Sequence, residues 1–313
     1  MSEVPIVEPE AHPKGKYAWQ NLLVLFLQVC AWWTILTALH RYESWAVRLP
    51  LLLLFCAMMQ GVFSLMHECF HRNAHPDKRI NDLVCWVGAT LFATSPTLHR
   101  VQHWGHHVRN RTEAERGDFI HSGETAGKKI TLYYVAVLGG LWISGFVFPL
   151  LVPFLPYCVV SYLARTKRFN TYAGIFANLK PQDWQRVRIE AVASAACWAL
   201  AVWLSGWSWP LLAIAYGCFA FTWSSLQWVY HLGAPIDVVE GAYNLRLPTP
   251  LRWFFLNFNY NLTHHREPHR PWQELFAASN QKETQPLWYR WALVFKPPVP
   301  YPEDLSDLAK RYF

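Results

Sequence analysis

Apolar residues along this chain are gathered into long blocks separated by short polar segments. Four blocks have close to the length of a membrane-spanning helix, namely residues 21–39, 47–66, 189–204 and 211–230. A helix needs about 20 consecutive apolar residues to cross the hydrocarbon core of a bilayer. Because only a few residues separate the first block from the second, and the third from the fourth, the pattern predicts two transmembrane hairpins.

A longer apolar stretch, residues 131–164, lies between the two hairpins. It is interrupted by glycine or proline at Gly139, Gly140, Gly145, Pro149, Pro153 and Pro156. Such interruptions are tolerated at membrane depth where other parts of the protein bury them. We therefore expect a broken or re-entrant segment here. Residues 83–93 form an apolar stretch too short to span, and we expect them at the membrane interface.

Composition favours a membrane protein and argues against several other classes. Charged residues make up only 16% of the 313 residues, compared with about a quarter in an ordinary soluble domain. The net charge of +7 does not indicate nucleic-acid binding, because all lysines and arginines except Arg41 and Arg48 lie in segments assigned to the inner side. Seven cysteines, an odd number with no Cys-x-x-Cys pair, argue against a disulfide scaffold.

The predicted architecture is a single all-α integral membrane domain covering residues 1–313. Its polar N-terminal tail, residues 1–18, is expected on the inner side and lacks the features of a cleavable signal peptide. Two transmembrane hairpins and the broken middle segment would support a cytoplasmic helical cap. Residues 276–313 continue an aromatic and basic region, so we expect a C-terminal tail at the membrane interface.

Histidine carries the candidate chemistry of this chain. Of the 14 histidines, seven form three close groups: His67 and His71; His103, His106 and His107; His264 and His265. Residues three or four apart share one face of a helix, and the neutral imidazole ring is the commonest side-chain metal ligand. One histidine alone would usually be an interfacial polar residue. Three groups, which the hairpins bring to the same side, favour a metal site.

The number of histidines indicates two metal ions. A zinc site takes three or four protein ligands, so one ion cannot use them all. Imidazole suits zinc, copper, iron and nickel alike, and the ligand type leaves the metal open. Carboxylate-type di-iron bundles need paired Glu-x-x-His motifs, and only Glu68 with His71 matches. A nitrogen-rich dimetal site is the better interpretation.

The three groups resemble the histidine boxes of the membrane fatty-acid desaturase superfamily, which includes lipid desaturases, hydroxylases and carotenoid hydroxylases. That family has His-x3-His or His-x4-His, then His-x2-His-His, then His-x2-His-His or Gln-x2-His-His. In the same order, this chain has His67-Glu-Cys-Phe-His71, His103-Trp-Gly-His106-His107 and Asn261-Leu-Thr-His264-His265. The resemblance extends over residues 51 to 275.

The resemblance implies eight metal-binding histidines. His231 ends the last predicted membrane helix, where the family has an isolated histidine, and it joins the seven in the boxes. The implied ligands are His67, His71, His103, His106, His107, His231, His264 and His265. Asn261 departs from the family's His or Gln, so we expect it to act through water or from outside the ligand shell.

Other polar residues near the boxes are expected to support the ligands. Gln227, one turn before His231, is a candidate outer partner. The carboxylates that we expect to accept hydrogen bonds from ligand rings are Glu68, Asp82, Asp118 and Glu267. Direct metal binding is not expected of His75, His99 or His269.

The resemblance also implies an activity. It predicts an O2-dependent di-iron oxidoreductase that introduces a double bond into a fatty acyl chain or lipid, with two iron ions as cofactors and O2 as co-substrate. Hydroxylation of a lipid or carotenoid at the same site remains an alternative. A zinc-dependent membrane hydrolase or a non-catalytic metal-binding membrane protein is the alternative from another class.

The implied partners follow from this activity. The substrate would be a lipid or acyl chain within the bilayer, reaching an active site on the cytoplasmic face of a multi-pass membrane protein. The chain has no haem-binding or flavin-binding motif, so electrons are expected from an external ferredoxin- or cytochrome-type donor. Arg109 and Arg111 are candidates for docking such a donor on the basic inner face.

Overall fold

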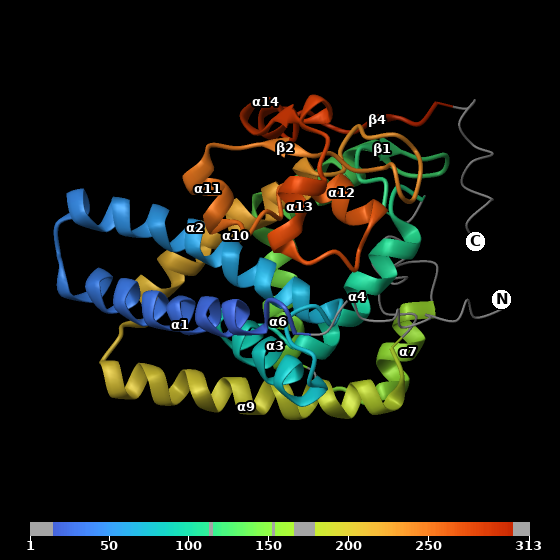
Figure 1. Cartoon of the computed structure of the whole chain (residues 1–313). Coiled ribbons are helices and arrows are strands. Elements are labelled where there is room, and N and C mark those ends of the chain that lie inside the picture. The colour runs from blue at the N-terminus through green and yellow to red at the C-terminus, as the bar shows by residue number, and fades with distance from the viewer. Residues whose placement is uncertain (1–14, 113–114, 152–153, 166–178, 303–313) are drawn as a thin grey trace.

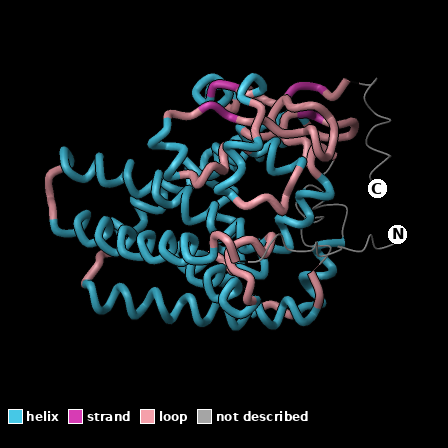
Figure 2. The backbone as a smooth tube through the Cα atoms, in the orientation of Figure 1, coloured by secondary structure: helices cyan, strands magenta, loops and turns pink. Residues whose placement is uncertain are grey.

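The protein is built almost entirely from helices. The computed structural model describes residues 15–112, 115–151, 154–165 and 179–302. Within this part of the chain, the strands are only two residues long each (Figure 2). The expected all-α class is confirmed. The first 14 residues of the N-terminal tail and the last 11 residues of the C-terminal tail lie outside the described residues.

Five helices in the described residues are long and apolar enough to cross a membrane. They are α1 (Ala18–Arg41), α2 (Trp45–Phe70), the continuous run Ala126–Leu151, α9 (Pro181–Ser205) and α10 (Trp209–Val229). Short loops join α1 to α2 and α9 to α10 (Figure 1). The helical hairpins that the apolar blocks predict are therefore present.

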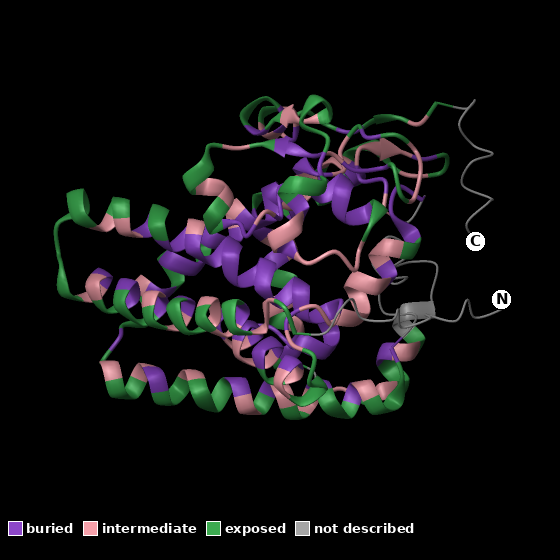
Figure 3. Cartoon of the chain, in the orientation of Figure 1, coloured by how far each residue is buried: buried purple, intermediate pink, exposed green. Residues whose placement is uncertain are grey.

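The helices that flank the bundle present apolar side chains outward. Figure 3 shows exposed residues along α9, whereas buried residues concentrate on α2 and in the middle of the molecule. On α9, Ile189, Val192 and Trp203 are 71%, 60% and 77% exposed. Large apolar side chains in such positions suit contact with lipid rather than water.

The middle stretch is a helix with a break at its glycine pair. It consists of α5 (Ala126–Val135), the π-helical turn η1 (Ala136–Gly140) and α6 (Leu141–Leu151). Gly139 has a φ of 126°, which glycine adopts readily and other residues do not. The break frees the backbone N–H of Trp142, which donates instead to the hydroxyl of Ser224 on α10 at 3.0 Å.

The break predicted in this stretch is thus confirmed, but its form differs from a short re-entrant loop. The run Ala126–Leu151 has 26 residues, long enough for a fifth span. Residues 152 and 153 lie outside the described part, and α7 (Tyr157–Arg165) follows. That this segment is re-entrant stays a prediction.

The end of the apolar stretch 83–93 lies inside the helical core, and its expected position at the membrane interface stays a prediction. It belongs to α3 (Lys78–Phe92), which stops at Ala93 in the left-handed conformation. Phe92 is buried, with its ring 5.3 Å from that of Phe219 and 5.1 Å from that of Trp223. The length of the stretch alone does not reveal that α10 and its neighbours surround the end of α3.

Side chains of three neighbouring helices satisfy the end of α3. The last carbonyl groups of any helix lack partners within the helix, and in an apolar core each unpaired group is costly. Here the indole and phenol groups of α6, α9 and α10 donate to three successive carbonyls. The pairs are Trp198 Nε1 with Thr90 O (2.9 Å), Tyr216 Oη with Leu91 O (2.6 Å) and Trp142 Nε1 with Phe92 O (3.1 Å).

The next helix, α4 (Pro96–Arg109), begins directly after this turn and is held by a carboxylate of α9. Ser95 caps the helix by accepting from the N–H of Leu98. Glu190 accepts from the hydroxyls of Ser95 and Thr97, each at 2.6 Å, and from the N–H of Thr97 at 3.1 Å. A carboxylate at a helix N-terminus is also favoured by the helix dipole. Glu190 therefore anchors the start of the helix that carries the second histidine box.

The C-terminal part of the chain folds over one side of the bundle. Its elements are β2 (Leu245–Arg246), α11 (Thr249–Phe254), α12 (Asn261–Arg266), α13 (Trp272–Ala278), η4 (Gln281–Glu283), β3 (Gln285–Pro286), α14 (Leu287–Leu293) and β4 (Val299–Pro300). Two short parallel ladders close this region: β2 pairs with β3, and β4 pairs with β1 (Phe119–Ile120). The second ladder links the C-terminal region to the loop that follows α4.

Removing the carboxylate that anchors α4 is expected to destabilise the bundle. In Glu190→Ala, the hydroxyls of Ser95 and Thr97 and one backbone N–H lose their acceptor, at a cost of about 2–3 kcal/mol. Thermal unfolding of the purified protein in detergent should show a lower midpoint. Glu43→Ala, an exposed carboxylate in the loop between α1 and α2, is the control. Equal midpoints for the two variants would contradict the anchoring role.

Candidate metal centre

Helix ends bring the histidine boxes together. His67 lies in the last turn of α2, and His71 caps that helix. The second box occupies the C-terminal half of α4, and the third lies on the short helix α12. His231 follows directly after α10 and its cap residue Tyr230. Because α2, α4, α10 and α12 end or lie in one region, the boxes meet there despite their separation in sequence.

Five of the histidines form one compact group, here called the five-histidine group. Its members are His67, His71, His103, His107 and His264. Each offers one ring nitrogen, and these nitrogens all lie within 4.8 Å of one another. All three boxes contribute to it. The ring of His67 lies 4.3 Å from those of both His103 and His264.

The other three histidines form a second group beside the first, here called the three-histidine group. It consists of His106, His231 and His265, again with ring nitrogens within 4.8 Å of one another. Ring centroids within the group are 4.7 to 5.2 Å apart. The ring of His265 is also 4.7 Å from that of His107 in the five-histidine group, so the two groups are adjacent. Together they contain all eight histidines that the sequence singles out.

The ring nitrogens of the five-histidine group face one another, and neutral rings have too few N–H groups for every close nitrogen–nitrogen contact to be a hydrogen bond. Nε2 of His103 lies 2.6 Å from Nε2 of His71 and 3.0 Å from Nε2 of His107, which in turn is 3.1 Å from Nε2 of His264. A neutral ring carries one N–H and one lone pair. Both nitrogens of His67 are buried without a hydrogen-bond partner. Lone pairs that converge in this way suit a cation at their centre, so the residues present fit a metal ion.

The surroundings keep these rings in the form that binds metal. Burial, followed by repulsion from neighbouring histidines, lowers the pKa of His71, His103 and His107 well below the ordinary value of 6.5. The same causes bring the pKa of His264 to about 3. Burial likewise lowers the pKa values of His231 and His265. The rings are therefore neutral at physiological pH and need not lose a proton before binding a metal.

The three-histidine group has well-defined outer contacts. Nδ1 of His106 lies 2.6 Å from a carboxylate oxygen of Glu115, and Nδ1 of His231 lies 3.0 Å from the carbonyl oxygen of Gly241. A ring that donates from Nδ1 presents Nε2 as its lone pair, and such partners orient metal-binding histidines in general. Glu115 is a functional candidate that sequence reasoning missed. It lies nine residues beyond His106, past the end of α4, where no helical spacing indicates it.

The carboxylates that we expected in this role make other contacts. Glu68 accepts from the backbone N–H of Trp272 at 3.2 Å. The other three pair with arginines: Asp82 with Arg72 and Arg100, Asp118 with Arg111, and Glu267 with Arg270. None of these four carboxylates contacts a box histidine directly among the described contacts, because nearness in sequence to a box does not show which way a side chain turns. An outer or water-mediated role for Glu68 stays a prediction.

Asn261 and Gln227 remain candidates for outer contacts. The side-chain oxygen of Asn261 is buried without a hydrogen-bond partner. Asn261 precedes His265 by four residues on α12, so both lie on one face of that helix. The side-chain nitrogen of Gln227 is also buried without a partner, one turn before His231. Their roles at a metal stay predictions.

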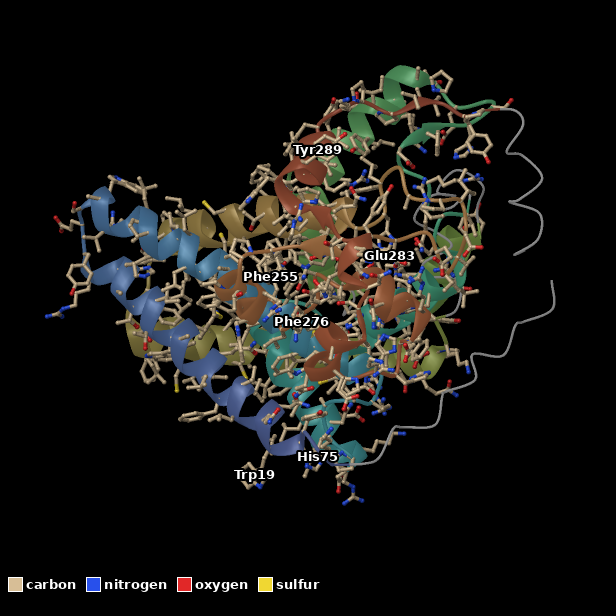
Figure 4. The ribbon with its side chains drawn as sticks, turned by 45° about the horizontal axis from the view of Figure 1, so that its top comes forward. Trp19, His75, Phe255, Phe276, Glu283 and Tyr289 are labelled. Carbon is tan, nitrogen blue, oxygen red and sulfur yellow. The ribbon has the colours of Figure 1, made fainter. Side chains whose placement is uncertain are left out.

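Three nearby histidines lie outside both groups. His75 accepts from the backbone N–H of Asp77, and Figure 4 shows it at the edge of the molecule. His99 sits one turn before His103, but its ring is enclosed by aromatic side chains and its Nδ1 contacts the hydroxyl of Thr94 at 3.1 Å. The ring centroid of His269 lies 6.2 Å from that of His71.

The structure contradicts the suggestion that Arg109 and Arg111 dock an electron donor. Arg109 is 8% exposed, and its guanidinium group lies 3.7 Å from Glu115. Arg111 is 2% exposed and pairs with Asp118 at 2.8 Å. Both follow the second box directly, but the loop after α4 folds inward and buries them. They are structural ion-pair partners rather than surface contacts.

Comparison with known proteins agrees with this geometry. The family profile described as "Fatty acid desaturase" matches residues 43–295, which include all eight histidines of the two groups. The chain belongs to the fatty acid desaturase family. A protein named "Fatty acid desaturase" from Bacillus subtilis (strain 168) is 22% identical to it over 299 residues, covering 87% of this chain and 78% of that relative. Family membership makes this desaturase-type chain an oxidoreductase enzyme.

Loss of a histidine from either group is expected to lower the metal content of this desaturase-family protein. His71→Ala removes a member of the five-histidine group, and His265→Ala a member of the three-histidine group. The bound metal per chain, measured by plasma mass spectrometry after purification, should fall by at least about half in each variant. His75→Ala is the matched control and should keep the full content. Unchanged metal in both test variants would show that the groups do not bind metal.

His99 is expected to make the protein acid-sensitive. Burial lowers its pKa from 6.5 to about 4, so the unfolded chain binds this proton more readily than the folded one. The stability of the folded state is complete above pH 6.5 and decreases as the pH falls from 6.5 toward 4. Between pH 7 and 5.5 this group costs about 1 kcal/mol. The midpoint of thermal unfolding should therefore fall more steeply for the wild type than for His99→Gln, and parallel pH curves would contradict this.

Proposed function

We propose that this chain is an O2-dependent di-iron membrane oxidoreductase that introduces a double bond into a fatty acyl chain or lipid. The observation that carries the proposal is the pairing of two adjacent groups of histidines, holding eight rings in all, in a member of the fatty acid desaturase family. The proposed cofactors are two iron ions. Imidazole nitrogen suits iron as well as zinc and copper, and the family supports the choice of iron.

The residues of the site would have two roles, metal binding and exclusion of water. The five-histidine group would hold one ion and the three-histidine group the other, and bound iron would supply the activation of O2 needed to remove hydrogen from an unactivated C–H bond. The burial of His67, His71 and His264 keeps bulk water away from this region. Exclusion of water protects reactive chemistry from side reactions.

The substrate side of the proposal rests on the membrane helices. Five candidate spans and the exposed apolar side chains of α9 are suited to contact acyl chains. An active site on the cytoplasmic face follows from the distribution of arginine and lysine in the sequence. Lys128 and Lys129, for example, lie in the first turn of the helical run Ala126–Leu151. An external ferredoxin- or cytochrome-type protein would supply the electrons.

The proposed activity can be tested by expression in a bacterial host whose membrane lipids are fully saturated and defined. Gas chromatography with mass spectrometry should reveal a new unsaturated acyl chain that has lost two hydrogens. His265→Ala should abolish the product, and the exposed variant Glu43→Ala should retain it. The purified wild-type protein should contain about two irons per chain, as eight imidazole ligands imply.

Other outcomes would replace the proposal by a stated alternative. A product that has gained one oxygen would identify a hydroxylase using the same site. A single zinc per chain without any oxidised product would exclude the oxidase and favour the metal-dependent hydrolase. Two irons with no change in any lipid would leave the metal site intact but contradict the substrate class.

A further inference from the structure

The two histidine groups differ in their surroundings. In the three-histidine group, the ring of His106 contacts the carboxylate of Glu115 at 2.6 Å, a short and charge-assisted distance. In the five-histidine group, the described contacts of the rings are with one another and with aromatic side chains, and Nδ1 of His71 and of His264 is buried without a partner. A carboxylate therefore supports only the smaller group among the described contacts.

Gly105 in the second box lets Arg109 take a position beside Glu115. Gly105 lies between His103 and His106 on α4, and a Cβ atom at this position would collide with the guanidinium group of Arg109. Glycine thus lets the Arg109 side chain lie back along its own helix, although glycine inside a helix costs about 1 kcal/mol relative to alanine. In this position Arg109 is buried and faces the second oxygen of Glu115 at 3.7 Å. The cation holds the carboxylate between itself and His106.

The same loop also supports His231. The side-chain amide of Asn110, the residue that caps α4, donates to the carbonyl of Gly241 at 3.2 Å. That carbonyl is also the acceptor for the Nδ1 atom of His231. Asn110 is 1% exposed, so this contact is shielded from solvent. The segment just after the second box therefore contacts one ring directly, that of His106 through Glu115, and through Asn110 it holds the backbone acceptor of a second ring, that of His231.

We propose that Glu115 is a positioning residue that controls metal occupancy of the three-histidine group selectively. The inference rests on the proposed two-metal function and deepens it, since it assigns one carboxylate to one of the two centres. With only three imidazoles, this group has fewer ligands than its neighbour and depends more on the strength of each. The carboxylate fixes the tautomer of His106 and makes its Nε2 a better donor to metal.

Replacement by glutamine separates this role from simple packing. In Glu115→Gln the amide oxygen can still accept from Nδ1 of His106, so the shape is kept while the negative charge is lost. Loss of an outer hydrogen-bond partner of a metal ligand typically weakens metal affinity roughly 10- to 100-fold. We expect the variant to keep about one tightly bound metal per chain and to bind the second weakly.

The test is a titration of the metal-free, full-length protein with Fe²⁺ under anaerobic conditions, followed by equilibrium dialysis. Wild type should show two tight equivalents, whereas Glu115→Gln should show one tight equivalent and one weakened about 10- to 100-fold. Titration with Co²⁺ provides a spectroscopic readout. Two equivalents of Co²⁺ should produce the visible bands of both centres in wild type, whereas in Glu115→Gln the bands of the three-histidine centre should be missing. Because Glu115→Gln also removes the ion-pair partner of the buried Arg109, the metal-free variant should unfold at a somewhat lower temperature than wild type. Tight binding of one equivalent together with weakening of only the other is the result that a merely structural role would not give.

Two further variants sharpen the interpretation. Glu124→Gln makes the same substitution nine residues away, at a carboxylate paired with Lys129, and should bind two equivalents as wild type does. Gly105→Ala displaces Arg109 and should reproduce part of the loss seen in Glu115→Gln. Two tight equivalents in Glu115→Gln would overturn the inference, as would equal weakening of both centres. If wild type itself binds fewer than two irons, the proposed function fails instead, so the two failures are distinguishable.

Discussion

The structure depends on one interaction that protein atoms alone cannot complete, the convergence of imidazole nitrogens within the five-histidine group. Four successive Nε2 atoms lie 2.6 to 3.1 Å from their neighbours, and His67 has no hydrogen-bond partner at either nitrogen. Buried polar atoms without partners cost free energy. A metal ion would take one nitrogen from each ring, and its binding would then stabilise the fold that brings α2, α4 and α12 together.

A second constraint acts on the same region from inside the bundle. The turn from α3 to α4 places backbone polar groups among apolar helices, where none can be left unpaired. Trp198, Tyr216 and Trp142 donate to the last carbonyls of α3, and Glu190 accepts from the start of α4. These partners lie on helices that carry none of the box histidines. The direction of α4, and with it the second box, is therefore set by membrane helices at some distance from the metal centre.

Sequence reasoning predicted the parts of this arrangement that depend on local spacing. Apolar blocks gave the long helices, and residues three and four apart gave the shared faces of His67 with His71 and of the second box. Spacing does not reveal what a face packs against. For that reason the roles of Glu115 and Glu190 were missed, and so was the enclosure of the end of α3 by its neighbouring helices.

The burial of Arg109 and Arg111 also shows that position in the sequence does not reveal what a side chain packs against. A basic residue beside an active site suggests a docking surface, but Arg109 and Arg111 are buried and matched by Glu115 and Asp118. Their charges are thereby compensated locally. Among the described contacts of the two histidine groups, only that of His106 involves a carboxylate, so the charge of any bound ion would be offset chiefly through Glu115.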